Sequence, residues 1–189
     1  MNYRGEAAAP TERMYLLVGA AASPRSAIQF HGRNTFMNYD CNPRGHGLRK
    51  GRVSLPNNVY HITTTTLSRR PIFTDLYIAR EVVKCIHHPQ RNAATMAYVI
   101  MPDHMHWLMQ LGQEGELSRE VGDVKSISTR MISRLQGERG SIWQSGFHDH
   151  AVRQDEELRR VARYIIANPL RAGLVKDIGR YSLWDAVWL

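Results

Sequence analysis

Two histidines separated by one residue, His104 and His106, are the clearest chemical feature of this sequence. They open the segment HMHWLMQL, whose apolar residues predict a β-strand. Residues i and i+2 of a strand point to the same face, so both imidazoles would project together while Met105 points into the core. Two neutral imidazoles side by side can bind a divalent metal. The pattern alone leaves a second interpretation open, in which the two histidines are half-buried on a strand face.

A second pair with the same spacing, His148 and His150, lies on a strand predicted over 147–153. Here the middle residue is Asp149, so the opposite face of this strand is not obviously core. The second pair is therefore the weaker candidate for a metal site. The alternative is a position near a backbone or an active-site pocket.

Tyr164 and Asn168 lie at the end of a helix predicted over 155–167. The expected buried stripe of this helix is Leu158, Val161, Ala162, Ile165 and Ile166. Tyr164 lies at the edge of the stripe, where its hydroxyl can reach a cleft, and Asn168 follows four residues later on roughly the same face. We expect Pro169 to stop the helix and to disfavour helical backbone at Asn168. The alternative is a packing tyrosine followed by a helix-terminating Asn-Pro.

Together these residues predict metal-assisted chemistry on a phosphodiester. A tyrosine hydroxyl ordinarily has a pKa of about 10 and is a poor nucleophile at neutral pH. It becomes useful where a metal polarises the phosphate and organises the attack. Two imidazoles and an amide oxygen would leave open metal positions for phosphate oxygens and water.

The elements that must position these residues alternate between strands and helices. We expect strands over 59–67, 94–101, 104–111 and 147–153 and helices over 75–87, 118–135 and 155–167. Thr74 or Asp75 would cap the first helix, and Pro102-Asp103 would form the turn between two strands. Hairpin-linked strands with helices between them predict an α+β fold, an antiparallel sheet with helices packed on it.

Composition restricts the class of protein. The chain has 189 residues and a formal net charge of +8, which favours a polyanionic partner, nucleic acid first and an anionic membrane second. No run approaches the roughly 18 apolar residues of a membrane-spanning helix. Cys41 and Cys85 form no CxxC pair or Cys/His cluster, which argues against a disulfide framework or a structural zinc site and suits a reducing cytoplasm.

The first part of the chain differs from the rest. Residues 1–47 are rich in Ala, Pro, Gly and Asn and show no hydrophobic period, so we expect a poorly ordered N-terminal extension. Met37 lies inside this extension and is an alternative start to Met1. The working domain is then expected over 48–189.

Several segments, in a fixed order, resemble one family. The segment YVIMPDHMHWL over 98–108 looks like the HUH motif region of single-tyrosine transposases of bacterial insertion sequences. The segment ARYIIANPLRAGLV over 162–175 closely resembles the tyrosine helix of one branch, the REP-associated tyrosine transposases. Shorter segments at 124–126, 142–147 and 181–186 also look like this family. The resemblance runs from about Leu48 to Leu189, and the ordered set is more specific than any single motif.

The resemblance implies a fold and a reaction. The fold would be a central antiparallel sheet flanked by helices, with both histidines on a middle strand. Tyr164 would be the nucleophile that cuts single-stranded DNA, giving a 5′-phosphotyrosine and a free 3′-hydroxyl, and a later attack by a 3′-hydroxyl would join strands. His104, His106 and Asn168 would bind Mg²⁺ or Mn²⁺. Relatives with Gln in place of Asn168 depart from this sequence.

The resemblance also implies the DNA, a short palindromic repeat that folds as a single-stranded hairpin with a flanking tetranucleotide. Basic residues along the family region are candidate DNA contacts: Arg49, Lys50, Arg52, Lys125, Arg153 and Arg171. Each is equally consistent with a solvated surface charge. Trp107 alternates away from His106, so we expect it to pack in the core rather than stack on a base. His148 and His150 do not match the metal motif and are candidates to line the site or the DNA path.

Three functions follow from these residues. The leading one is a metal-dependent transposase that cleaves and transfers single-stranded DNA through Tyr164. The alternative is a hairpin-binding protein of the same fold that has lost catalysis. A third is an unrelated hydrolase in which His104, His106 and a metal activate water, without a covalent DNA adduct. We expect a cytoplasmic, nucleoid-associated protein with no membrane partner, acting as a monomer or weak dimer.

Overall fold

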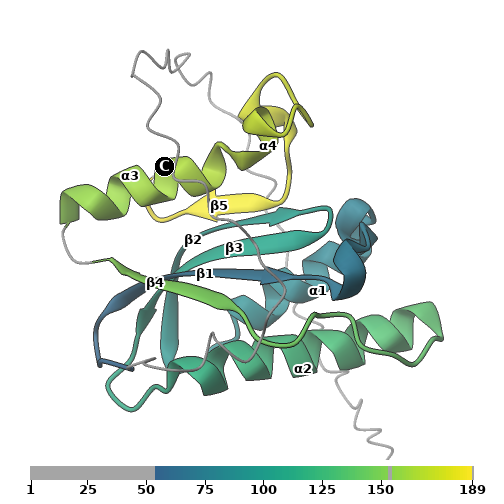
Figure 1. Ribbon diagram of the computed structural model, residues 1–189, viewed down its shortest axis with the longest axis horizontal. Helices are drawn as coiled ribbons and strands as arrows, with labels where there is room; N and C mark the ends of the chain where they lie inside the picture. Colours follow the sequence, from purple (N-terminus) through teal and green to yellow (C-terminus); the bar gives the residue numbers. More distant parts are fainter. Residues whose placement is uncertain (1–53, 153–154, 189) are drawn as a thin grey trace, which may run out of the picture. The chain divides into compact units, whose positions relative to one another are not determined.

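The strand that carries His104 and His106 lies in the middle of a five-stranded antiparallel sheet (Figure 1). The strands are β1 (Val59–Thr65), β2 (Ala93–Met101), β3 (His104–Leu111), β4 (His148–Val152) and β5 (Trp184–Ala186). Their order across the sheet is β4-β1-β3-β2-β5. The predicted α+β architecture, an antiparallel sheet with flanking helices, is confirmed.

This computed structural model describes residues 54–152 and 155–188. The N-terminal extension predicted over 1–47 lies outside these ranges, and the domain start at residue 48 remains a prediction. Individual predicted residues also lie outside them: Met37, Arg49, Lys50, Arg52 and Arg153.

Alternation along β3 separates the two histidines from the core. Met105 and Trp107 are fully buried among residues of the flanking helices. Trp107 Nε1 donates a hydrogen bond to Thr95 Oγ1 on β2, at 3.0 Å. The half-buried His104 and His106 point to the opposite face. The predicted core positions of Met105 and Trp107 are confirmed.

Two helices, α1 (Leu76–Ile86) and α2 (Leu117–Gln136), cover the face that carries Trp107 (Figure 1). Asp75 caps α1, because its Oδ1 accepts hydrogen bonds from the backbone N–H groups of Tyr77 and Ile78 at 2.8 and 3.4 Å. These bonds satisfy two donors that the first helical turn leaves unpaired. Short 3₁₀ turns complete the connections: η2 (Leu67–Arg69), η3 (Ile72–Thr74) and η4 (Ile178–Arg180).

The opposite face, which carries the histidines, is covered by α3 (Asp155–Ile166). Ala162, Ile165 and Ile166 are buried against apolar residues of β2 and β3, as their spacing predicted. Figure 1 shows α3 on one side of the sheet and α1 and α2 on the other. The sheet therefore has a separate apolar cluster on each face.

One expectation about the end of this helix was wrong. Pro169 does not keep Asn168 out of a helix, because the chain turns at Ala167 and begins a new short helix, α4 (Asn168–Arg171). Pro169 lies in its first turn, where the missing backbone N–H would have had no partner within the helix. The helix predicted over 155–167 is confirmed as α3, and α4 follows it directly.

The C-terminal aromatic residues form an edge of the sheet that the sequence pattern did not predict as a strand. Trp184 and Ala186 of β5 pair with Val99 and Ala97 of β2. Tyr181 Oη donates to Ile100 O at 2.7 Å, and Trp184 Nε1 donates to Ile178 O at 3.1 Å. The strand pairing and the Tyr181 bond attach the C-terminal segment to the sheet, and the Trp184 bond holds η4 against β5.

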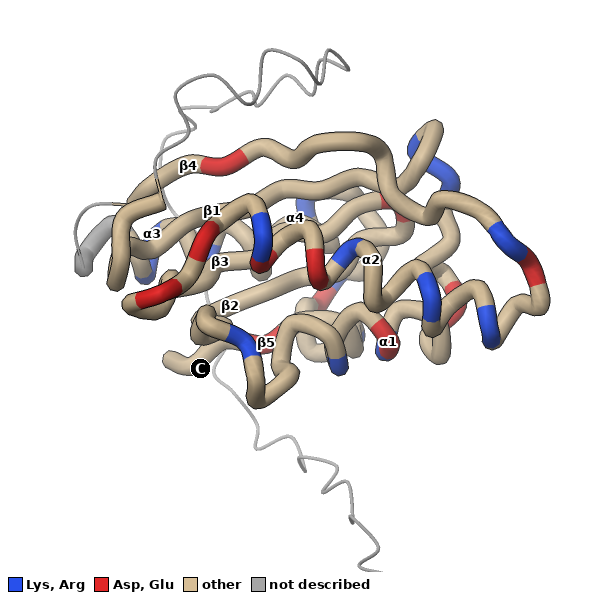
Figure 2. The backbone as a smooth tube through the Cα atoms, turned by 90° about the horizontal axis from the view of Figure 1, so that it is seen from below, with Lys and Arg blue, Asp and Glu red and all other residues tan. Residues whose placement is uncertain are grey.

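Charged residues lie mainly on helices and connecting segments (Figure 2). The three central strands, β1, β2 and β3, contain no Asp, Glu, Lys or Arg. Histidines and threonines are therefore the main polar side chains of these strands, beside Gln110, Trp107 and two tyrosines. In the part of the chain that the structure describes, no helix is both long enough and apolar enough to cross a membrane.

Candidate active site

The strand register gathers five histidines on one face of the sheet. His106 lies opposite Thr63 of β1, and His104 lies opposite Thr65. On the other side of β1, His150 lies opposite His61 and His148 lies opposite Thr63. Paired residues of antiparallel strands share a face. Both spaced histidine pairs, together with His61, therefore lie on the face that α3 covers.

His106 uses one ring nitrogen within the protein. Its Nδ1 lies 3.1 Å from His61 Nε2 and 3.1 Å from Thr63 Oγ1. These two contacts fix the plane of the ring and leave Nε2 as the nitrogen that can bind a metal. Such outer partners set the orientation of metal-binding histidines in proteins generally.

His104 is oriented by the turn residue that precedes it. Its Nδ1 lies 2.5 Å from Asp103 Oδ1, and Asp103 Oδ2 forms an ion pair with Arg69 at 3.1 Å. Burial acts to raise the pKa of Asp103, but the hydrogen bonds and charges of His104 and Arg69 outweigh it and lower the pKa below its ordinary value. The carboxylate therefore holds His104 with Nε2 directed away from it, and the His104 and His106 ring centroids are 5.0 Å apart.

Burial keeps two of these imidazoles neutral. Burial, and secondly the charge of His150, lowers the pKa of His61 to about 4. Burial also holds the pKa of His106 well below its ordinary value, with smaller contributions from the charges of His61, His104 and Arg171. Metal binding requires the neutral form of histidine, so this environment favours a ligand role near pH 7.

Tyr164 and Asn168 lie at the junction of α3 and α4. Tyr164 is half-buried. Asn168 Nδ2 donates to the backbone oxygens of Tyr164 and Ile165, at 3.0 Å each. The amide nitrogen therefore caps the end of α3, which leaves Oδ1 as the atom of Asn168 that can bind a metal.

Arg171 lies beside Tyr164, and its charge acts on a histidine of β3. Its guanidinium carbon lies 4.4 Å from the centroid of the Tyr164 ring. Its charge also contributes to the lowered pKa of His106. Of the predicted DNA contacts that the structure describes, Arg171 is thus the one next to Tyr164.

The donor set fits a divalent metal of the Mn²⁺ type. Two imidazole Nε2 atoms with fixed orientation and one amide oxygen suit a first-row transition metal, whereas Mg²⁺ prefers oxygen ligands. Over the described ranges, no group of three His, Cys, Asp or Glu residues is arranged to hold a metal. A site built on His104 and His106 therefore needs a third ligand of another type, and Asn168 is the predicted one.

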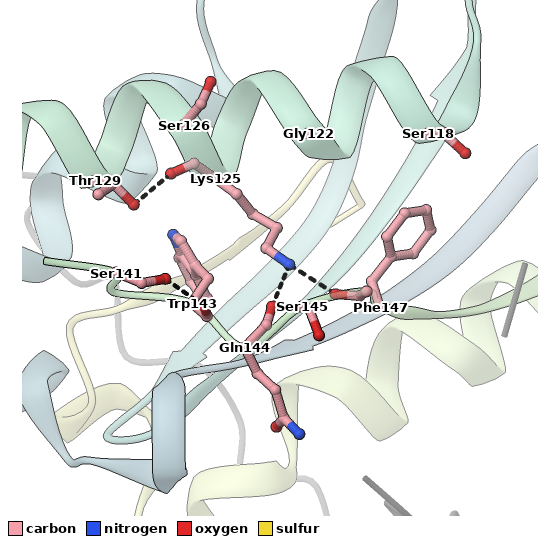
Figure 3. Close-up of a pocket in the computed structure, with 11 residues that line it drawn as sticks. Ser118, Gly122, Lys125, Ser126, Thr129, Ser141, Trp143, Gln144, Ser145 and Phe147 are labelled. Atoms are coloured by element: carbon pink, nitrogen blue, oxygen red, sulfur yellow. Dashed lines mark hydrogen bonds between the residues drawn. The ribbon is translucent and has the colours of Figure 1, made fainter. Parts of the chain in front are cut away.

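Lys125, another predicted DNA contact, extends from α2, which covers the other face of the sheet. Its Nζ donates to Gln144 O and Gly146 O at 2.6 and 2.7 Å, and burial lowers its pKa to about 8. Lys125 lines a cavity of about 640 Å³ together with Trp143 and Phe147. Figure 3 shows its side chain extending from α2 toward these carbonyls. Lys125 thus binds the segment before β4, and its contact with DNA remains a prediction.

The sequence pattern does not identify His61 or Thr63 as site residues. Both lie on β1 at alternate positions, a pattern that indicates one polar face of the strand. Which histidine they contact depends on how β1 pairs with β3, a non-local property. The alternating polar residues were the available signal, but they do not specify the partner.

The low pKa of His61 predicts a loss of stability in acid. The unfolded chain takes up a proton near pH 6.5, whereas folded His61 resists protonation down to about pH 4. The contribution of neutral His61 to the free energy of unfolding is therefore fully present above pH 6.5, and it is lost as the pH falls toward 4. We expect the free energy of unfolding to fall by about 2 kcal/mol more between pH 7 and 4.5 in the wild type than in His61→Gln. Urea denaturation at the two pH values measures this difference, and equal losses in both proteins would contradict it.

Comparisons with known proteins give a family match and two related proteins. Residues 54–168 match the protein family described as Transposase IS200 like. A Haemophilus influenzae protein named as a REP-associated tyrosine transposase is 31% identical over 104 residues, which cover 50% of this chain and 57% of that relative. A REP-associated tyrosine transposase of Escherichia coli is 31% identical over 84 residues, 43% of this chain and 47% of the relative. The matched region thus spans about half the length of each relative.

The fold also has a counterpart among solved structures. A REP-associated tyrosine transposase, solved bound to a REP hairpin, superposes with a TM-score of 0.58 and 24% sequence identity. The superposition covers 70% of this chain and 79% of that chain. This likeness supports the sheet and helix arrangement described above.

Proposed function

This chain belongs to the family of IS200-like transposases, and from that premise we propose that it cuts and joins single-stranded DNA with Tyr164 as nucleophile. The observation that carries the proposal is the position of Tyr164 at the edge of α3, under the Arg171 guanidinium, whose charge also reaches His106. A nucleophile, a cation and a metal-binding face are the components that phosphoryl transfer requires.

In the proposed reaction, Tyr164 Oη attacks the phosphorus of a DNA phosphodiester. The bond from phosphorus to the 3′-oxygen breaks, and the phenolic proton passes through solvent to that oxygen. The products are a 5′-phosphotyrosine and a free 3′-hydroxyl. One phosphodiester replaces another, so no co-reactant is needed, and attack by a 3′-hydroxyl reverses the link and joins strands.

His104, His106 and Asn168 are the residues that would hold a divalent metal, Mn²⁺ or Mg²⁺. When bound, the metal would polarise the phosphate and neutralise charge that develops in the transition state. Asp103 holds the ring of His104, and Thr63 and His61 hold the ring of His106. These residues act by fixing the direction of each Nε2 before DNA binds.

The proposed substrate is a palindromic repeat that folds as a single-stranded hairpin with a flanking tetranucleotide. Support comes from the related transposase that was solved with a REP hairpin. The net charge of +8 is consistent with binding to a nucleic-acid backbone. We expect the protein to work in the cytoplasm, beside chromosomal DNA, as a monomer or weak dimer.

A hairpin pool tests the proposal. The protein is incubated with Mn²⁺ and labelled single-stranded oligonucleotides that carry a stable hairpin and a randomised flanking tetranucleotide, and a pool with a scrambled stem serves as the control. We expect a covalent protein–DNA band in a denaturing gel with the hairpin pool only. A complex in a native gel without a covalent band would instead indicate a hairpin-binding protein that has lost catalysis. Cleavage without any adduct would indicate a hydrolase that uses water.

A further inference from the structure

The backbone around α4 fixes the position of Arg171, its last residue. Arg171 N donates to Ala167 O at 3.0 Å. After the helix, Gly173 N donates to Leu170 O at 3.1 Å and Leu174 N donates to Pro169 O at 2.9 Å. This pair of bonds is a Schellman motif, and it needs a left-handed residue, which Gly173 supplies with φ +69°. Arg171 therefore extends from a short helix that is closed at its C-terminal end.

The guanidinium of Arg171 lies over the ring of the proposed nucleophile. The distance of 4.4 Å from its central carbon to the Tyr164 ring centroid is within the range of a cation–π contact. This contact places a permanent positive charge beside the tyrosine side chain. Arg171 is thus next to the proposed nucleophile.

Arg171 differs from Arg69 and Arg91 in its partners. Arg69 forms an ion pair with Asp103, and the buried Arg91 forms one with Glu120 at 3.2 Å. Among the side chains that the structure describes, no carboxylate forms an ion pair with Arg171, which is exposed. Its hydrogen-bond donors are therefore able to bind an anionic ligand without first breaking an ion pair.

We propose that Arg171 is a catalytic residue that binds a non-bridging oxygen of the scissile phosphate while Tyr164 attacks it. This inference rests on the proposed function and adds a charge-stabilising group to it. As the bond from Tyr164 Oη to phosphorus forms and the bond to the 3′-oxygen breaks, negative charge grows on the non-bridging oxygens. The planar guanidinium can donate two parallel hydrogen bonds to these oxygens and stabilise that charge. The phenolic proton leaves as described above, so Arg171 takes up and releases none.

Three substitutions separate charge from packing. Arg171→Ala removes the whole side chain, Arg171→Met keeps apolar bulk over the Tyr164 ring without charge, and Arg171→Lys keeps a charge without the planar fork. Arg134→Ala is the matched control, because it removes an exposed arginine in the last turn of α2, on the far side of the sheet. For each protein we measure the single-turnover cleavage rate on a hairpin that the wild type cuts, the Kd for that hairpin, and the melting temperature.

We expect Arg171→Ala and Arg171→Met to cleave roughly 100-fold more slowly than the wild type, with Kd within about threefold. Arg171→Lys should recover about tenfold of the lost rate, and Arg134→Ala should match the wild type. If the Ala variant does not fold, the Met and Lys variants still show whether the charge of Arg171 speeds cleavage.

Three results would overturn the role of Arg171. These are a Met variant within about fivefold of the wild-type rate, a Lys variant no faster than the Met variant, and a loss of affinity as large as the loss of rate. The proposed function fails separately, if the wild type itself forms no covalent adduct. An adduct with the wild type and equal rates in the Met variant would remove only the role of Arg171.

Discussion

Tyr164→Phe is expected to abolish the covalent DNA adduct and to slow strand cleavage by roughly 10⁴-fold, the scale of losses seen when a nucleophile is removed from an enzyme. Phe keeps the ring that lies under Arg171, and the tyrosine is half-buried, so the packing of α3 should remain. Only the oxygen that would attack phosphorus is lost. The Kd for the hairpin should therefore change by less than about threefold.

Tyr181→Phe is the matched control for this prediction. It also removes one tyrosine hydroxyl, which donates to Ile100 O at 2.7 Å. We expect it to lower the free energy of unfolding by about 1 kcal/mol and to leave adduct formation intact. Adduct formation is measured in a denaturing gel, the Kd for the hairpin in a native gel, and the free energy of unfolding by urea denaturation. An adduct that survives in Tyr164→Phe would mean that another residue is the nucleophile.

The second large effect concerns His104. His104→Gln is expected to weaken Mn²⁺ binding by at least about 100-fold, because it removes a proposed direct ligand, whereas loss of an outer partner alone typically costs about 10–100-fold. The cleavage rate at a fixed Mn²⁺ concentration should fall as Mn²⁺ binding weakens. Binding is measured without DNA, from the electron paramagnetic resonance signal of free Mn²⁺, so the result does not depend on catalysis.

The second histidine pair provides the control. His148→Gln changes a residue on the same face of the sheet, from a pair with the same spacing, at an edge strand instead of the central strand. We expect its Mn²⁺ affinity to stay within about threefold of the wild type. Equal losses in the His104 and His148 variants would contradict the assignment of the metal ligands.

The features that the sequence predicted well are those set by neighbours in the chain. The alternation in HMHWLMQL gave the bounds of β3 and placed Met105 and Trp107 in the core. The cap of α1 at Asp75 depends only on the next few backbone N–H groups. Local periodicity and local hydrogen bonds are enough to predict such features.

The features that it missed depend on contacts between distant parts of the chain. His61 reaches His106 only through the register of β1 on β3, and 45 residues separate the two. β5 is short, and 85 residues separate Trp184 from its partner Val99 on β2. Strand pairing of this kind is not encoded in the pattern of either strand alone.

The junction of α3 and α4 was predicted only in part from the sequence pattern. Pro169 marked a helix end correctly, but it did not show that the chain would begin a new helix at Asn168. That new helix is what places Arg171 over the Tyr164 ring. The motif predicted the candidate residues of the site, and the structure showed that Arg171 lies over Tyr164.

The most direct test of the central claim is to locate the DNA on the protein. The adduct formed by the wild type with a cleaved hairpin is digested with nuclease and trypsin, and the modified peptide is identified by mass spectrometry. Cleavage after Arg163 and Arg171 gives a peptide over 164–171 in which Tyr164 is the only tyrosine. We expect the nucleotide on Tyr164, joined through its 5′-phosphate. A nucleotide on any other residue, or one joined through a 3′-phosphate, would contradict the proposed reaction.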